Sequence, residues 1–170
     1  NVIQWSYGLF RDVCYEVGRK YYPDVEIDDY HIDAMTAHMV KRLKDFDVIV
    51  TTNLFGDILS DLAGELTGSL GLGPSINTNG KQCMAQAAHG SAPDIAGQNI
   101  ANPVGLMLSA VMMFEWLAAN RDDEKFAAAA KTMQKAVLDT MAAGELTPDM
   151  GGTETTTGFT EAVVRRIQNM

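Results

Sequence analysis

The spacing of hydrophobic residues predicts a chain built mainly of helices. Apolar side chains recur at intervals of three and four residues, which is the period of an amphipathic helix. This pattern covers residues 5–22, 34–43, 104–119, 122–143 and 157–170. The helix over 104–119 is apolar at most positions, so we expect it to lie in the core, and it is too short to span a membrane.

Two other stretches have the pattern of β-strands. Residues 25–27 alternate between apolar and polar side chains, and residues 46–52 form an apolar run that is typical of a buried strand. A further helix is expected to begin at Gly56 and to end near Thr67. Strands and helices that alternate with short connections predict an α/β fold.

A loop and a short strand are expected after this helix. Residues 68–75 carry glycines in the order G-x-x-G-x-G and follow a helix, whereas a Rossmann fingerprint has the order G-x-G-x-x-G and follows a strand. Asn79-Gly80 is a turn signal, and residues 82–88 are expected to form the strand. A domain boundary is expected near Gly68, where the α/β pattern gives way to a loop.

Composition narrows the range of partners. The chain carries a net charge of −9 and has a pI near 4.6, so nucleic acid and anionic membrane surfaces would be repelled. No apolar run approaches the roughly 20 residues that span a bilayer. Cys14 and Cys83 lie far apart without a C-x-x-C pattern, which favours free thiols in a reducing cytoplasm.

Two aspartates in the predicted helix 56–67 form the first candidate site. Asp57 and Asp61 are four residues apart, so on a helix they share one face, and no Lys or Arg is beside them in sequence. A divalent cation such as Mg²⁺, which takes carboxylate oxygens as ligands, would relieve their repulsion. A solvated acidic face near a helix N-terminus is the simpler alternative.

The second candidate site is the stretch from His89 to Gly97, followed by Asn102-Pro103. It is rich in small residues, which let backbone approach a ligand closely. Asp94 has a carboxylate that can accept hydrogen bonds from both hydroxyls of a ribose. A surface loop with ordinary turn chemistry is the alternative on composition alone.

Taken together, these motifs resemble a known family. Residues 53–61, 68–71, 89–97 with Asn102-Pro103, and 149–152 resemble the isocitrate and 3-isopropylmalate dehydrogenases, which are β-decarboxylating dehydrogenases. The resemblance covers essentially the whole chain and implies the C-terminal half of a two-lobed, open α/β sheet. Residues 1–67 would then be part of the metal-binding and dimer-interface lobe, and residues 68–170 part of the nucleotide-binding lobe.

The resemblance also implies roles for particular residues in a homodimer or higher oligomer. Asp57 and Asp61 of one subunit would bind Mg²⁺ or Mn²⁺ together with Asp33 of the partner subunit, and Asp33 and Asp57 would act in catalysis through that metal. Asn1 would lie near the nicotinamide. The residues expected to bind NAD are Asn1, His89, Gly90, Ser91, Ala92, Asp94, Ile95 and Asn102.

The preference for NAD has a physical argument. The Asp94 carboxylate would repel the 2′-phosphate of NADP, and NADP-type relatives carry Lys-Tyr where this chain has Asp94-Ile95.

The implied reaction is the oxidation and decarboxylation of a small 2-hydroxy-3-carboxy acid. His31 and His38 are interpreted as structural residues.

The same resemblance limits what this chain is expected to do alone. The family's catalytic Lys and Tyr belong upstream of Asn1, so the isolated chain is predicted to be inactive. A non-catalytic subunit that binds nucleotide and metal is the alternative. The substrate stays open between isocitrate, 3-isopropylmalate and close relatives, because residues 86–89 depart from the isopropylmalate pattern and residues 98–103 lean toward NAD-isocitrate relatives.

Overall fold

The computed structural model describes residues 3–170, which form two compact units. One unit ends at Ala63, and the other runs from Gly64 to Met170. The division falls inside a helix, a few residues before the predicted boundary. Each unit has its own cluster of buried hydrophobic side chains.

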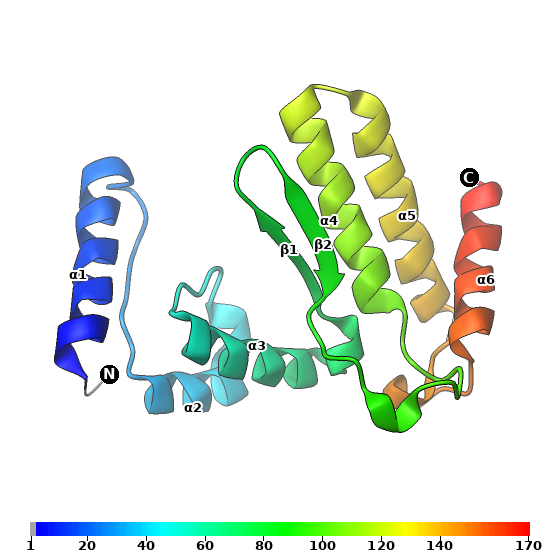
Figure 1. Ribbon diagram of the computed structural model, residues 1–170, viewed down its shortest axis with the longest axis horizontal. Coiled ribbons are helices and arrows are strands. Elements are labelled where there is room, and N and C mark those ends of the chain that lie inside the picture. Colours follow the sequence, from blue (N-terminus) through cyan, green and yellow to red (C-terminus); the bar gives the residue numbers. More distant parts are fainter. Residues whose placement is uncertain (1–2) are drawn as a thin grey trace. The chain divides into compact units, whose positions relative to one another are not determined.

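Helices dominate the first unit (Figure 1). They are α1 (Gln4–Tyr21), α2 (Ile32–Arg42) and the start of α3 (Asn53–Thr67), with one 3₁₀ turn at Leu43–Asp45. The first two confirm the predicted helices, whereas α3 begins at Asn53 rather than at Gly56. The core of this unit joins α2 to α3 through buried side chains of Met35, Met39 and Leu59.

The predicted strands at 25–27 and 46–52 are wrong. Neither stretch forms a strand, and within residues 3–63 the structure contains none. A strand is held by hydrogen bonds to a neighbouring strand, and the described part of this unit offers no such neighbour. The apolar run therefore stays irregular, with Val48 80% and Val50 67% exposed.

This exposed run leads to a prediction about self-association. We expect the chain to associate as its concentration rises, because exposed apolar residues with unpaired backbone groups promote contact between molecules. Val48→Lys combined with Val50→Lys should shift the association to higher concentration in sedimentation velocity. Val40→Lys, at an exposed position of α2, is the matched control. A monodisperse wild-type monomer at all concentrations would contradict the prediction.

The second unit combines a hairpin with three helices. Its strands are β1 (Pro74–Thr78) and β2 (Cys83–Ala87), and its helices are α4 (Val104–Arg121), α5 (Glu124–Ala142) and α6 (Thr156–Gln168). The strand predicted over 82–88 and the turn at Asn79-Gly80 are confirmed, but β1 lies partly in the stretch predicted to be a loop. The three predicted helices are confirmed to within a few residues.

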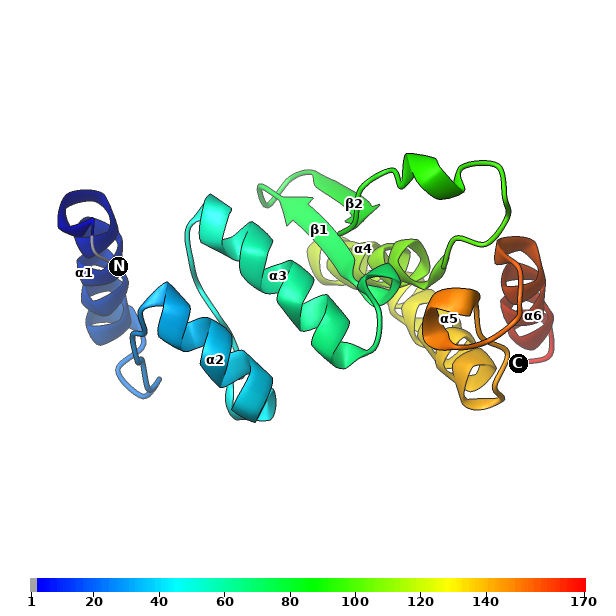
Figure 2. The same ribbon diagram turned by 90° about the horizontal axis from the view of Figure 1, so that it is seen from below.

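These elements pack in a simple order (Figures 1 and 2). The antiparallel hairpin covers one side of α4, α5 packs against another side of α4, and α6 packs against α5. This arrangement explains why α4 is apolar at most positions, as the core-helix prediction required. The buried cluster draws on all three helices: Val104, Ala136, Val137, Phe159 and Val163.

One hydroxyl in α4 reaches both strands of the hairpin. Ser109 Oγ is fully buried, accepts a hydrogen bond from the Ser75 backbone N–H at 3.0 Å and lies 2.6 Å from the Gln86 carbonyl oxygen. It is also 2.7 Å from the Gly105 carbonyl of its own helix. Ser75 and Gln86 are cross-strand partners in the hairpin.

The helix boundaries have local causes. Asp123 caps α5 by accepting from the Lys125 N–H at 2.9 Å, and Thr155 caps α6 by accepting from Gly158 N–H at 3.0 Å. Cys14 and Cys83 are free thiols. Across residues 3–170, none of the helices combines the length and apolar character needed to cross a bilayer.

Candidate functional site

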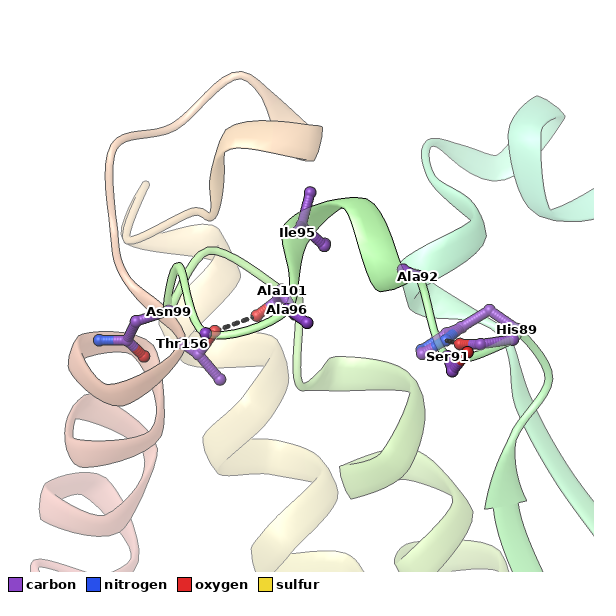
Figure 3. Close-up of a pocket in the computed structure, with 10 residues that line it drawn as sticks. His89, Ser91, Ala92, Ile95, Ala96, Asn99, Ala101 and Thr156 are labelled. Atoms are coloured by element: carbon purple, nitrogen blue, oxygen red, sulfur yellow. Dashed lines mark hydrogen bonds between the residues drawn. The ribbon is translucent and has the colours of Figure 1, made fainter.

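A pocket of about 410 Å³ lies along the loop that joins β2 to α4 (Figure 3). Most residues that line it come from this loop, and one comes from the start of α6. Of the residues predicted to bind NAD, those from His89 to Ala92 and Ile95 are brought together here. The complete lining is His89, Gly90, Ser91, Ala92, Ile95, Ala96, Gly97, Asn99, Ala101 and Thr156.

Several residues in left-handed conformations shape this loop. Ala92 has φ of 44° and Asn99 has φ of 57°, and a short 3₁₀ helix, Pro93–Ile95, lies between them. For a residue with a side chain this conformation costs on the order of 1–2 kcal/mol. Strained backbone of this kind clusters at binding sites, which supports a functional role for the loop.

The start of α6 holds the far end of the loop. The Thr156 hydroxyl donates to the Ala101 carbonyl at 2.5 Å, and the Thr156 backbone N–H donates to the Asn99 carbonyl at 2.9 Å. The Asn99 side-chain oxygen in turn accepts from the N–H of Thr157 at 3.2 Å and from its hydroxyl at 3.0 Å. Sequence reasoning missed Asn99 and Thr156 as lining residues, although the run of threonines before the last helix was a visible signal.

His89 and Ser91 lie together at the other end of the pocket, as Figure 3 shows. His89 Nδ1 is 2.9 Å from the Gly90 carbonyl oxygen. In the tautomer that donates this bond, Nε2 is left to accept a hydrogen bond from a ligand. The two side chains therefore offer both a donor and an acceptor at this end.

The remaining predicted cofactor residues do not line the pocket. Asp94 is exposed on the short 3₁₀ helix, and its carbonyl accepts from the Gln98 amide at 2.8 Å. Asn102 is buried, with its side chain bonded to the Val104 N–H at 3.0 Å and to a neighbouring carboxylate. Asn1 lies outside the described residues.

The predicted metal-binding aspartates all lie in the first unit. Asp57 and Asp61 are exposed on one face of α3, one turn apart. Asp33 is exposed in the first turn of α2 and accepts from the Ala34 N–H at 2.9 Å. Among residues 3–170, no three His, Cys, Asp or Glu side chains gather closely enough to hold a metal ion.

One chain thus presents a carboxylate pair rather than a complete metal site. In the described part of the chain, no recorded ion pair involves Asp57 or Asp61. Paired carboxylate oxygens are the donors that Mg²⁺ and Mn²⁺ prefer. The two carboxylates supply part of a donor set of this kind.

Fold and site together define an α/β protein with a pocket on a β-to-α loop. Residues 1–163 match the family model described as isocitrate/isopropylmalate dehydrogenase. The isocitrate/homoisocitrate dehydrogenase of Thermus thermophilus is 46% identical over 170 residues, which are 100% of this chain and 48% of that protein. The chain therefore belongs to the isocitrate/isopropylmalate dehydrogenase family.

Further similarities agree with this assignment. Mitochondrial isocitrate dehydrogenase [NAD] catalytic subunit 6 of Arabidopsis thaliana is 44% identical over 165 residues, covering 96% of this chain and 42% of that protein. The crystal structure of isocitrate dehydrogenase from Methylococcus capsulatus superimposes with a TM-score of 0.90 at 39% identity, over 99% of this chain and 48% of that one. The chain spans about half the length of the relatives it matches, and the predicted α/β fold class is confirmed.

Proposed function

We propose that this chain supplies the NAD-binding and metal-binding part of an oxidative decarboxylase. Its substrate would be a 2-hydroxy-3-carboxy acid such as isocitrate, 3-isopropylmalate or a close relative. The observation that carries the proposal is the pocket, because residues selected from the sequence for NAD binding, His89 to Ala92 and Ile95, line one cavity. Membership of a dehydrogenase family supplies the reaction class.

In this proposal the loop holds the adenosine half of the dinucleotide. The small side chains of Gly90 and Ala92 let the backbone approach the ligand, and His89 and Ser91 donate or accept hydrogen bonds at one end. The Asp94 carboxylate accepts from the ribose hydroxyls and disfavours a 2′-phosphate, which selects NAD over NADP.

The metal half of the proposal rests on the aspartates. Asp57 and Asp61 would hold Mg²⁺ or Mn²⁺ together with Asp33 of the partner subunit in a homodimer. When bound, the ion would act as a Lewis acid on substrate oxygens. The role of the aspartates is to fix its position. The Lys and Tyr that transfer protons in the family would come from outside these 170 residues.

A chimera tests the activity directly. The remaining half of the Thermus thermophilus enzyme, placed ahead of residue 1, should restore reduction of NAD with isocitrate, homoisocitrate or 3-isopropylmalate, while the 170-residue chain alone gives none. The readout is absorbance at the wavelength of NADH. A folded, dimeric chimera that reduces no NAD with any of these acids would overturn the enzyme proposal. Binding of NAD without turnover would favour the non-catalytic subunit.

Asp94→Lys tests the preference between cofactors. Replacing the carboxylate with an ammonium group removes the ribose contact and attracts the 2′-phosphate, so the ratio of NADP to NAD affinity should rise about tenfold or more. Calorimetric titration of both nucleotides measures the ratio. Asp122→Lys, the same charge change at the C-terminal end of α4, should leave it unchanged. An unchanged ratio in Asp94→Lys would remove Asp94 from the cofactor site.

The compartment and assembly also stay predictions. Free thiols at Cys14 and Cys83 fit a reducing compartment such as the cytoplasm. A homodimer is proposed because Asp33 of a partner subunit would complete the proposed metal site, and residues 3–170 of one chain bring no third such side chain to the aspartate pair.

A further inference from the structure

A single carboxylate ties together three loops of the second unit. Asp149 Oδ2 accepts hydrogen bonds from the Ser69 hydroxyl at 2.5 Å and from the Asn102 amide at 2.9 Å. Its other oxygen, Oδ1, accepts from the Thr147 hydroxyl at 2.6 Å. The three donors come from the loop after α3, from the end of the pocket loop and from the loop before α6.

The surroundings of this carboxylate are tightly packed. Ser69, Asn102 and Thr147 are all buried, although Asp149 itself is exposed. A Cβ added at Gly71 would lie 2.8 Å from Asn102 Cβ and 3.0 Å from Asp149 Oδ2. The three loops therefore have little room to shift relative to one another.

The hydrogen bonds also favour the charged form of the Asp149 side chain. Desolvation is the largest single influence and would raise the pKa of Asp149, but the bonds from Ser69, Thr147 and Asn102 together lower the pKa below its ordinary value. A carboxylate offers lone pairs to all three donors at once. An amide in its place would present an N–H₂ group to at least one of them.

The carboxylate is connected to both sides of the pocket's far end. Asn102 directly follows Ala101, whose carbonyl accepts from Thr156 at the pocket edge. On the other side, residues 147–155 lead from the carboxylate to the start of α6, which bonds to Asn99. Movement of residues 101–102 or of the 147–155 loop would displace residues that line the pocket.

We propose that Asp149 is a positioning residue for the nucleotide pocket, holding residues 99–102 against the start of α6. Asp149 is not among the residues that line the pocket, and it acts through Asn102 and through the loop that leads to Thr156. The inference rests on the proposed NAD function for its consequence in binding, but its structural consequence can be measured without any ligand.

Two variants and a control test this role. Asp149→Ala removes both acceptor oxygens and with them all three hydrogen bonds, and Asp149→Asn keeps the shape but removes the charge. Val137→Ala is the control, because it destabilises the same unit from the buried core cluster and leaves the hydrogen bonds of Asp149 in place. Hydrogen exchange of residues 89–101, followed by mass spectrometry well below the melting temperature, reports on the pocket directly, and calorimetry measures the Kd for NAD.

We expect Asp149→Ala to speed exchange across 89–101 about tenfold and to weaken NAD binding by a similar factor, since loss of the shared acceptor leaves buried donors unpaired. Asp149→Asn should show a smaller change in both. Val137→Ala should lower the melting temperature and change neither. If Asp149→Ala lowers only the melting temperature, as Val137→Ala does, Asp149 is an ordinary stabilising residue and the proposal is overturned.

The proposals fail in distinguishable ways. Wild-type protein that binds no NAD would defeat the proposed function, while the exchange measurement would still decide the role of Asp149. If Asp149→Ala does not fold, the same test can be made with Asp149→Asn and with Ser69→Ala, which removes one of the three hydrogen bonds to Asp149. Exchange that stays at the wild-type rate in both would overturn the positioning role.

Discussion

Phe159→Ala is expected to lower the free energy of unfolding of the 64–170 unit by about 3–5 kcal/mol. Phe159, in α6, is fully buried and packs in a cluster formed by side chains of α4, α5 and α6. Three separate helices would have to move together to fill the space left by the ring. We therefore expect the cavity to persist and the cost to be near the upper part of the range.

Fluorescence can follow this unit alone. The chain has two tryptophans, Trp5 in α1 and Trp116 in α4, so a Trp5→Phe background leaves only Trp116 to report urea unfolding. Leu138→Ala, at a half-exposed position of α5, is the control and should cost less than about 1 kcal/mol. A Phe159→Ala cost as small as that of Leu138→Ala would mean that this cluster is not the core of the unit.

Asp57→Asn is expected to weaken Mg²⁺ binding by about 100-fold or more in the assembled dimeric chimera. The amide keeps the size of the side chain but removes one carboxylate of the Asp57–Asp61 pair on α3, and affinity for hard cations depends strongly on the charge of the ligands. Mn²⁺ binding followed by electron paramagnetic resonance, or Mg²⁺ calorimetry, gives the affinity. Asp47→Asn, an exposed carboxylate in the same unit, should leave it unchanged.

Mixing variants tests whether the metal site is shared between subunits. Asp57→Asn and Asp33→Asn homodimers should each lose tight binding. When the two chains are refolded together, each heterodimer would keep one site with all its aspartates intact. Random pairing should therefore restore about a quarter of the sites. Unchanged affinity in Asp57→Asn would withdraw the metal assignment, and no recovery on mixing would place all the ligands in one chain.

The helices were predictable because their signal is local. Apolar spacing predicted five of the six α-helices to within a few residues. The strand predictions depended on partners that a local pattern does not reveal. Residues 46–52 have the composition of a buried strand, yet in the described structure they have no neighbouring strand, and Val48 and Val50 stay exposed.

The candidate site likewise combines residues that a local sequence pattern reveals with residues that only folding brings together. His89 to Ala92 could be selected because they lie in a motif that resembles the dinucleotide-binding loop of the family. Asn99 and Thr156 line the same pocket but are far apart along the chain, so only folding brings them together. Asp149 was visible within a motif, whereas its bonds to Ser69 and Asn102 span distances that no local pattern reports.

Through Ser109, α4 determines how the two strands of the hairpin are aligned with each other. A pair of strands with few neighbours can slip by one residue, which would send every side chain to the opposite face. Only one alignment presents the Ser75 N–H and the Gln86 carbonyl to the same hydroxyl, because these two residues are paired. The end of β2 is thereby fixed along α4, and so is the point from which the pocket loop departs.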